Sequence, residues 1–465
     1  MSVNESVNGL FSDPVFRQFA TERPVATGVQ LVVHRLLQDS LVDEVVVEHS
    51  DAQYVRVQTF SVLTDMVSHV VMGKSPSINA AFKKFGDRLG VRINSVYEKL
   101  KRVETQTSQA LVRFSYRQAI AAQKEFGGVR RNDLAGYATR ILDGNCIGKT
   151  EHRLKETRTH GAAPLPGKSL VVYDPRHDAV CDMFPIEDGH AQERSSLDPV
   201  IETIGRNELW SADRNFCTLK FLYSIAEAKS VFVIRKHGLL HGTVKGKLKK
   251  IGRTDNGIVY ENKLVLPTYE GQTMTVRRVV IRLDTPTRDG DTEVVILSNV
   301  PAEKADGRKI SELYRDRWKI ETMFLHLTTA LKCEINTMCY PKASLYVFAC
   351  ALMAYNSLTL LKGAIAAEHG RDALEELSHY YLALEISQAS DGLLVALPEP
   401  RWAEVATLPS DSFVRELRSV VSFMKLSNYR KSKRGPRKPP SKRTNGSKKT
   451  HLSVKKILDA RKKAL

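Results

Sequence analysis

An aromatic hydroxyl, a guanidinium and a carboxylate share one predicted helical stripe, formed by Tyr314, Arg317 and Glu321. Because an α-helix turns by about 100° per residue, steps of three and four residues keep these side chains on the same side. A carboxylate beside groups that bind phosphate is typical of a metal-dependent enzyme that acts on nucleic acid. The alternative is an exposed amphipathic helix with ordinary i,i+4 charge pairs. Motifs elsewhere in the chain are needed to distinguish the two interpretations.

Two further carboxylates end short apolar runs earlier in the chain, at Asp143 in Ile-Leu-Asp-Gly and at Asp213 in Ser-Ala-Asp-Arg-Asn-Phe. The ends of strands in mixed α/β sheets are a common place for functional sites. Three clustered carboxylates repel one another unless a cation lies between them, and Mg²⁺ prefers carboxylate oxygens. Together with Glu321, these two acids could hold divalent ions that cut a phosphodiester, although each acid alone is more simply an ordinary surface or strand-end residue.

The spacing of apolar residues divides the chain into a helical first part and a mixed second part. Residues 15–118 carry apolar side chains at helical spacing. Residues 137–238 alternate short β runs with helices, which predicts a mixed α/β sheet. Alternating Val, Ile, Thr and Arg with Gly-containing turns predict a β-rich insertion at 239–300, before the long helix that carries Glu321.

Charge is distributed unevenly along the 465 residues, whose formal net charge is +18. Residues 425–465 hold 16 Lys/Arg against one Asp, so residues 1–424 carry only about +3. A basic end predicts a polyanion as partner, and we expect nucleic acid rather than a membrane. The most apolar run, at 345–361, is short and contains polar residues, which is typical of a buried core helix and not of a membrane span.

The termini and the cysteines set further expectations. From residue 428 the mixture of Lys, Arg, Pro, Ser and Gly cannot bury a core, so we expect a disordered basic tail at 428–465. The six cysteines show neither a Cys-x-x-Cys pair nor zinc-finger spacing, which is typical of reduced thiols in a cytosolic protein. The N-terminus has no basic n-region followed by an apolar h-region, so no secretory signal is predicted and we expect a cytoplasmic location.

A second candidate DNA contact lies in the helical first part, at residues 80–100. The sequence there predicts a helix, a turn at Gly90 and a second helix, which resembles a helix-turn-helix. The side chains that could meet DNA are polar and begin just after the turn; they are Arg92, Asn94, Ser95, Lys99 and Arg102. The alternative is an ordinary pair of packed helices joined at a glycine.

The three acidic motifs, taken together, resemble those of the insertion-sequence-four family of DDE transposases. The third motif carries most of the resemblance, because it has the Tyr314-x2-Arg317-x3-Glu321 signature and follows a β insertion. The resemblance spans roughly residues 136–350. It implies an α/β fold in which an RNase H-like mixed sheet forms the catalytic core, interrupted by an all-β insertion.

The resemblance also implies a reaction and its cofactor. Asp143, Asp213 and Glu321 are then the catalytic residues and hold two Mg²⁺ ions, for which Mn²⁺ can substitute. Water first attacks at the end of the element, and the freed 3′-hydroxyl then attacks target DNA, without a covalent intermediate between protein and DNA. Arg214 is expected to reach a phosphate or a neighbouring acid.

Roles in holding DNA follow from the third motif. Tyr314 and Arg317 are expected to contact phosphates close to the scissile bond. The family signature continues with a Lys seven residues after the Glu, where this chain has Thr328. We expect Lys332, eleven residues after the Glu and on the same stripe if the helix continues, to supply that phosphate contact. Trp318 is interpreted as a packing residue, with base stacking as the alternative.

These patterns predict a modular chain. The expected parts are a helical N-terminal DNA-binding region at 1–130, the first part of the core at 131–238, the β-rich insertion at 239–300, the second part of the core at 301–395, a helical segment at 396–427 and the basic tail at 428–465.

The predicted function is that of a cut-and-paste DNA transposase. It binds the terminal inverted repeats of its own insertion sequence as a homodimer, on the nucleoid in the cytoplasm of a bacterium, and binds target DNA. The first alternative is a transposase-derived protein that binds DNA without cutting it, a possibility that Thr328 keeps open. The second alternative is a repair or Holliday-type nuclease on the same fold, which would need no inverted repeats beside its gene.

Overall fold

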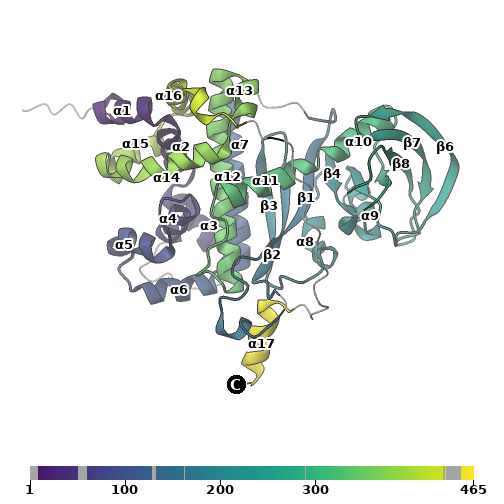
Figure 1. Ribbon diagram of the computed structural model, residues 1–465, viewed down its shortest axis with the longest axis horizontal. Coiled ribbons are helices and arrows are strands. Elements are labelled where there is room, and N and C mark those ends of the chain that lie inside the picture. Colours follow the sequence, from purple (N-terminus) through teal and green to yellow (C-terminus); the bar gives the residue numbers. More distant parts are fainter. Residues whose placement is uncertain are drawn as a thin grey trace, which may run out of the picture.

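The computed structural model describes residues 9–50, 60–127, 132–161, 163–287, 290–432, 435 and 452–464. Figure 1 shows a helical region at one end of the molecule, a sheet in the middle and a strongly curved β region at the other end. All six cysteines are free thiols, as the sequence predicted.

Helices make up the described part of the chain before the first strand, in agreement with the helical spacing of its apolar residues. Most of their apolar side chains are buried in one core cluster that also includes the helices after residue 341. The helices are α1 (Pro14–Glu22), α2 (Pro24–Leu36), α3 (Asp39–Glu48), α4 (Phe60–Val71), α5 (Ile78–Leu89), α6 (Ile93–Arg102) and α7 (Thr105–Phe126). The predicted helix-turn-helix corresponds to α5 and α6, and Gly90 between them has the left-handed conformation that ends helices.

The sheet has the order β3-β2-β1-β4-β5-β9-β8-β7-β6. Its strands are β1 (Ala138–Ile147), β2 (Gly167–Asp174), β3 (Ala179–Ile186), β4 (Glu208–Ala212), β5 (Val231–Arg235), β6 (Thr243–Thr254), β7 (Gly257–Val265), β8 (Thr275–Leu283) and β9 (Glu293–Ser298). Strands β1, β2 and β3 are antiparallel neighbours, whereas β4 runs parallel to β1 and β5 runs parallel to β4. The mixed α/β sheet that the sequence predicted is therefore confirmed.

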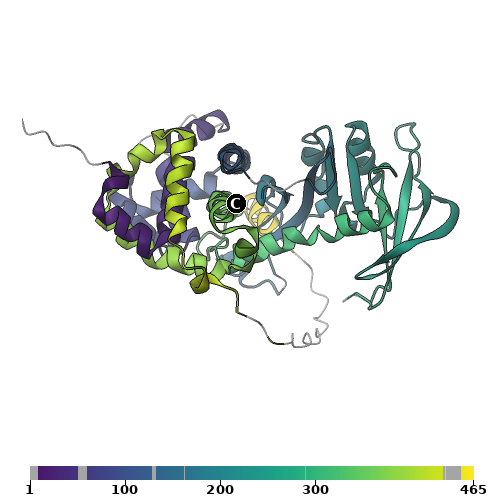
Figure 2. The same ribbon diagram turned by 90° about the horizontal axis from the view of Figure 1, so that it is seen from above.

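Helices cover both faces of the central strands. On one face, Ile141 and Ile147 of β1 belong to the core cluster shared with α7 and with α12 (Pro341–His369). On the other face, Leu142 packs with α9 (Leu219–Glu227), next to the short α8 (Asp198–Ile201). Viewed from above, the helical region and the β region lie on opposite sides of these central layers (Figure 2). Successive residues of β1 thus face different cores, as the alternation of a strand requires.

The predicted β insertion is joined to the central sheet. Strand β9 pairs with β8 on one side and with β5 on the other, so the same sheet continues from the core into the insertion. Helix α10 (Gly307–Arg315) packs against the strands of the insertion, where Ile310 and Leu313 are buried with Val259 and Val279. This packing fixes the start of the chain segment that leads to Glu321.

The expected single helix around Glu321 is two helices. Helix α10 ends at Arg315, and α11 begins at Trp318 and ends at Thr329. Asp316 and Arg317 between them keep right-handed backbone angles, but the amide of Arg317 bonds to the carbonyl of Tyr314, three residues back. The chain therefore tightens at Arg317 instead of continuing one straight helix.

The apolar run that the sequence assigned to the core is part of α12, and this prediction is confirmed. Among the described helices, α12 alone is long and apolar enough to cross a membrane, but its most apolar window is 94% buried inside the protein. The helices that follow complete the helical region; they are α13 (Arg371–Glu376), α14 (His379–Ala396), α15 (Ala403–Thr407) and α16 (Ser410–Ser422).

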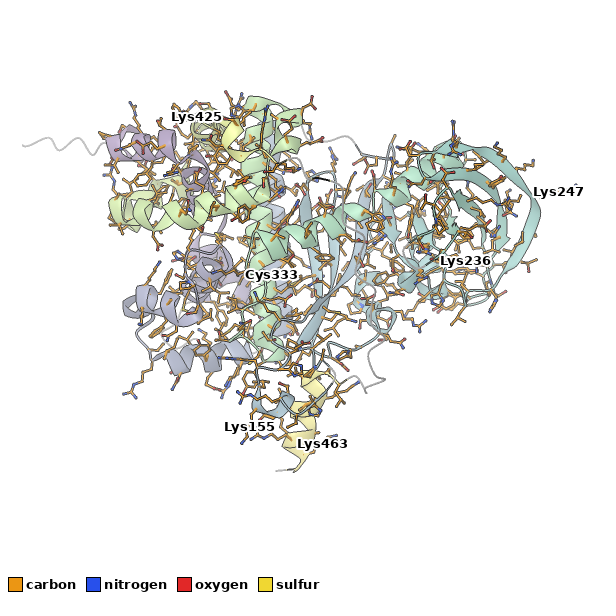
Figure 3. All side chains as sticks on the ribbon, in the orientation of Figure 1. Lys155, Lys236, Lys247, Cys333, Lys425 and Lys463 are labelled. Carbon is orange, nitrogen blue, oxygen red and sulfur yellow. The ribbon has the colours of Figure 1, made fainter. Side chains whose placement is uncertain are left out.

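The basic tail contains an ordered element that the sequence did not predict. Val454–Ala464 forms helix α17, which lies at the lower edge of the molecule beside the segment of Lys155 (Figure 3). Val454 is buried with Leu154 and Cys339, and Lys456 pairs with Asp188 at 2.9 Å. Short apolar positions among many charges were sufficient to dock this helix. Within the predicted disordered tail, residues 433–434, 436–451 and 465 lie outside the described residues.

Candidate active site

The sequence predicted Asp143 at the end of a strand, but the residue lies inside one. It is the sixth residue of β1, paired with Val171 of β2. Its odd position places the side chain on the face covered by α11 and α12, with Ile141 and Ile147. One carboxylate oxygen accepts a hydrogen bond from the amide of Gly144 at 2.9 Å.

Asp213 directly follows β4, as predicted. Its carboxylate caps the short 3-10 helix η4 (Arg214–Phe216) by accepting a hydrogen bond from the amide of Asn215 at 2.7 Å. Because β4 is the parallel neighbour of β1, the two aspartates lie on adjacent strands. The negative charge of Asp213 is close enough to raise the pKa of Asp143.

Arg317 joins the first and third motifs. Its Nη1 donates to Oδ2 of Asp143 at 3.1 Å, and its Nη2 donates to Oε1 of Glu321 at 2.8 Å. Asp143 precedes Arg317 by 174 residues, so this pair is made by the fold and not by local helix geometry. The guanidinium thus stands as a cation between two of the three predicted catalytic acids.

The guanidinium of Arg317 is enclosed. The residue is 7% exposed, and its carbon Cζ lies 5.8 Å from the ring centroid of Tyr314 and 5.6 Å from that of Trp318. Its Nε is buried and has no hydrogen-bond partner among the described residues. Trp318 itself is 58% exposed, so the prediction that it is a packing residue is wrong.

Burial dominates the electrostatics of Asp143. It raises the pKa of this carboxyl to about 7; the charge of Arg317 opposes the shift, and the charges of Asp213 and Glu321 add to it. Within the described part of the chain, no three Asp, Glu, His or Cys side chains lie close enough together to hold a metal ion. Asp143, Asp213 and Glu321 carry the carboxylate oxygens that divalent ions prefer, and two of them already share the positive charge of Arg317.

The remaining predicted phosphate contacts differ in their placement. Tyr314 is half-buried at the end of α10, and burial raises the pKa of its hydroxyl. Arg214 is exposed directly after Asp213, and its predicted contact with a phosphate or a neighbouring acid stays a prediction. Lys332 lies beyond the end of α11, and its amide bonds to the carbonyl of Val71. The prediction that Lys332 continues the helical stripe is therefore wrong.

Arg92 and Lys99, two of the basic candidates of the helix-turn-helix, also differ in their placement. Arg92 is exposed at the start of α6. Lys99 is half-buried, and its ammonium lies 4.3 Å from the centroid of the Phe60 ring. Burial lowers the pKa of Lys99, partly offset by Asp43. Neither observation tests DNA binding, which stays a prediction for both residues.

Sequence reasoning missed a carboxylate on the opposite face of β1. Glu193, in the 3-10 helix η3 (Glu193–Ser196), accepts a hydrogen bond from the side chain of Asn215 at 3.3 Å and lies against Gly144. Lys168 is 3.9 Å from its carboxylate. The segment around Glu193 carries no motif, and only the Asn two residues after Asp213 hinted at a further contact.

Comparison with known proteins connects this geometry to a family. Residues 135–357, slightly less than half of the chain, match the family model described as a transposase DDE domain. No curated protein matches the chain. Among solved structures, the cryo-EM structure of a piggyBac transposase synaptic complex with hairpin DNA is similar, with 11% identity and a TM-score of 0.38 over 87% of this chain and 86% of that one. The central part of this chain, which holds Asp143, Asp213 and Glu321, is thus similar to transposase DDE domains.

Proposed function

We propose that this protein is a DNA transposase that binds the terminal inverted repeats of its own insertion sequence and performs Mg²⁺-dependent hydrolysis and strand transfer. One observation carries the proposal: Arg317 bridges Asp143 and Glu321, from motifs far apart in the sequence, inside the segment that matches transposase DDE domains. An ordinary exposed helix pair does not place a buried cation on a strand carboxylate. The assignment to the insertion-sequence-four family rests on the Tyr-Arg-Glu spacing.

An RNase H-like core is part of the proposal. It is supported by the strand order β3-β2-β1-β4-β5, with three antiparallel strands followed by two parallel ones. It is also supported by the places of the acids, since Asp143 lies on β1 and Asp213 directly follows the adjacent β4. The third acid, Glu321, comes from a helix beyond the insertion.

The acids would hold two divalent ions through the carboxylates of Asp143, Asp213 and Glu321. When bound, such ions supply activation of the attacking water or hydroxyl and stabilisation of the leaving oxygen. Ions held by Asp143 and Glu321 would compete with the guanidinium of Arg317 for these carboxylates. The N–H donors of Arg317 would then be available for a DNA phosphate. Tyr314, whose ring lies against that guanidinium, restricts its direction.

The residues around the acids are placed to position DNA. Trp318 is exposed next to the guanidinium and can stack on a base that leaves the duplex at the cleavage site. Exposed Arg92 and the exposed Lys245, Lys247 and Lys249 of β6 supply sequence-independent contacts to phosphates. Synapsis of two element ends requires two copies, so the working form is a homodimer on bacterial DNA in the cytoplasm.

An excision assay in cells tests this function. The gene with its native flanks is placed on a reporter plasmid, and the wild type is compared with Asp213→Ala. We expect excision with the wild type and none with the variant, because Asp213 holds a catalytic ion. If neither excises the element although both bind its ends, the protein is the alternative, a transposase-derived protein that binds DNA without cutting it.

A further inference from the structure

Glu193 lies between the two turns that present the catalytic aspartates. Its carboxylate accepts a hydrogen bond from Nδ2 of Asn215 at 3.3 Å and lies directly over Gly144. Gly144 follows Asp143 on β1, and Asn215 follows Asp213 by two residues after β4. The carboxylate therefore spans the gap between two adjacent strands on the face opposite Arg317.

Gly144 gives this carboxylate its place. A Cβ atom on residue 144 would overlap a carboxylate oxygen of Glu193 and lie 2.6 Å from its Cδ and 3.1 Å from its Cγ. The backbone angle of Gly144 is not in the left-handed region, so space and not conformation requires glycine here. Any larger residue would push Glu193 away from the strand.

Glu193 reaches the two aspartates only through the residues beside them. The backbone amide of Gly144 donates to Asp143 at 2.9 Å, and the backbone amide of Asn215 donates to Asp213 at 2.7 Å. Glu193 accepts a hydrogen bond from the side chain of Asn215 and lies over Gly144. A shift of Glu193 would therefore act on the aspartates through these two residues.

Lys168 anchors the segment that carries Glu193. Its ammonium donates to the carbonyl of Ala191 at 3.0 Å and lies 3.9 Å from the Glu193 carboxylate, whose side chain is 17% exposed.

We propose that Glu193 is a positioning residue that sets the spacing of Asp143 and Asp213 for their ions. The inference rests on the proposed function, because it assigns a role within the same site. Outer partners that orient metal ligands typically change metal affinity or activity by about tenfold to a hundredfold when removed. Arg317 bonds Asp143 directly from one face of the sheet, whereas Glu193 would act from the other face through Gly144 and Asn215.

The test compares four variants of the full chain. Glu193→Ala removes the bridge, Glu193→Gln keeps the shape and the oxygen that accepts from Asn215, and Gly144→Ala displaces the carboxylate. Glu202→Ala, an exposed acid at the end of the neighbouring α8, is the matched control. Mn²⁺ binding to the DNA-free protein is measured by calorimetry, together with the Mg²⁺ dependence of cleavage, the affinity for DNA and the melting temperature.

We expect Glu193→Ala and Gly144→Ala to weaken Mn²⁺ binding and to raise the Mg²⁺ needed for cleavage by about tenfold or more, with DNA affinity and melting temperature unchanged. Glu193→Gln and Glu202→Ala should behave as the wild type. The double variant Gly144→Ala/Glu193→Ala should be no worse than Gly144→Ala alone, because the methyl group then has room.

Two results would overturn the inference. One is unchanged metal dependence in Glu193→Ala, and the other is additive losses in the double variant, which would mean that the two residues act separately. If the wild type cleaves DNA and Glu193→Ala is equally active, only the role of Glu193 is refuted. A wild type that neither binds Mn²⁺ nor cleaves refutes the proposed function instead.

Discussion

The candidate active site and the outer edge of the insertion differ in how their charges are matched. In the candidate site, the buried guanidinium of Arg317 is matched by the carboxylates of Asp143 and Glu321. Along β6, Lys245, Lys247 and Lys249 are exposed, and none has an ion-pair partner within the described residues. Figure 3 shows Lys247 at the outermost edge of the molecule.

The strand register of the insertion places several of its positive charges opposite one another. Lys245 lies opposite Lys263, and Lys263 lies opposite Arg277 on the next strand. Residues 243–283 contain nine Lys/Arg and three Asp/Glu. Like charges directly opposite each other destabilise a sheet, so an anionic partner would relieve them. Lysines on an edge strand also prevent edge-to-edge aggregation, which needs no partner.

The difference teaches how each region is organised. In the candidate active site, the guanidinium of Arg317 holds Asp143 and Glu321 through opposite charge. On the insertion, Lys245, Lys247 and Lys249 are exposed without an ion-pair partner among the described residues. We expect the first region to act in cleavage and the second in DNA binding.

Removing the balancing cation should have the largest effect. Arg317→Ala is expected to lower cleavage of an end duplex by about a hundredfold to a thousandfold, because it removes a preorganised charge from the site. Arg317→Lys should recover little, since one ammonium cannot bridge two carboxylates as a guanidinium does. The control is Arg315→Ala, whose exposed side chain pairs with Asp255 at 2.9 Å. Equal rates for the two alanine variants would contradict a role for Arg317.

The pKa of Asp143, raised to about 7 by burial, predicts a dependence on pH. Below pH 7 the carboxyl is protonated, and a proton must leave before an ion binds. The Mg²⁺ concentration for half-maximal cleavage should therefore rise about tenfold for each unit that the pH falls below 7, and level off above it. The measurement is a Mg²⁺ titration of cleavage at several pH values between 6 and 8. A half-maximal concentration that does not vary over this range would show that Asp143 is charged throughout.

Substituting the insertion lysines should change binding and not chemistry. Replacing Lys245, Lys247 and Lys249 by Ala should weaken DNA binding by about tenfold and make the slope of log affinity against log salt shallower by up to about 2.7. The cleavage rate at saturating DNA should stay the same. Arg415→Ala on α16, remote from the sheet in Figure 1, serves as the control. A salt slope identical to that of the wild type would leave these lysines with edge protection alone.

The smallest effect is expected at the C-terminal helix. Deleting residues 452–465 removes the pair between Lys456 and Asp188 and the buried Val454. Exposed ion pairs contribute at most about 1 kcal/mol each, so melting should fall by only a few degrees. Thermal unfolding of the truncated and full-length chains measures this. A large loss of stability would mean that α17 holds the loop before β2 in place, and Lys462→Ala controls for charge alone.

The sequence predicted which segments form helices and strands better than where those elements end. Periodic apolar residues were sufficient for the helical first part and the buried α12, because burial repeats along both of them. The break at Arg317 was not predictable, since the chain there remains right-handed and carries no Gly or Pro. Lys332 was misplaced because α11 ends at Thr329, where the chain also carries no Gly or Pro.

Contacts between distant segments were beyond sequence reasoning. Nothing local marks Glu193, whose role depends on Gly144 and Asn215 arriving beside it in the fold. The net charge of residues 1–424 concealed the basic insertion, because acidic segments elsewhere cancel it. A regional count of charges would have revealed the insertion, whereas the packing of α17 would have stayed hidden.

The most direct test of the central claim is cleavage by the purified chain. A duplex that carries the end of the element is incubated with wild type or Asp143→Asn, with Mg²⁺ or with EDTA, and DNA binding is measured in parallel. The account predicts that the wild type cuts only with Mg²⁺ and that Asp143→Asn binds equally but does not cut. Equal cutting by both proteins, or cutting in EDTA, would contradict a metal site built on Asp143.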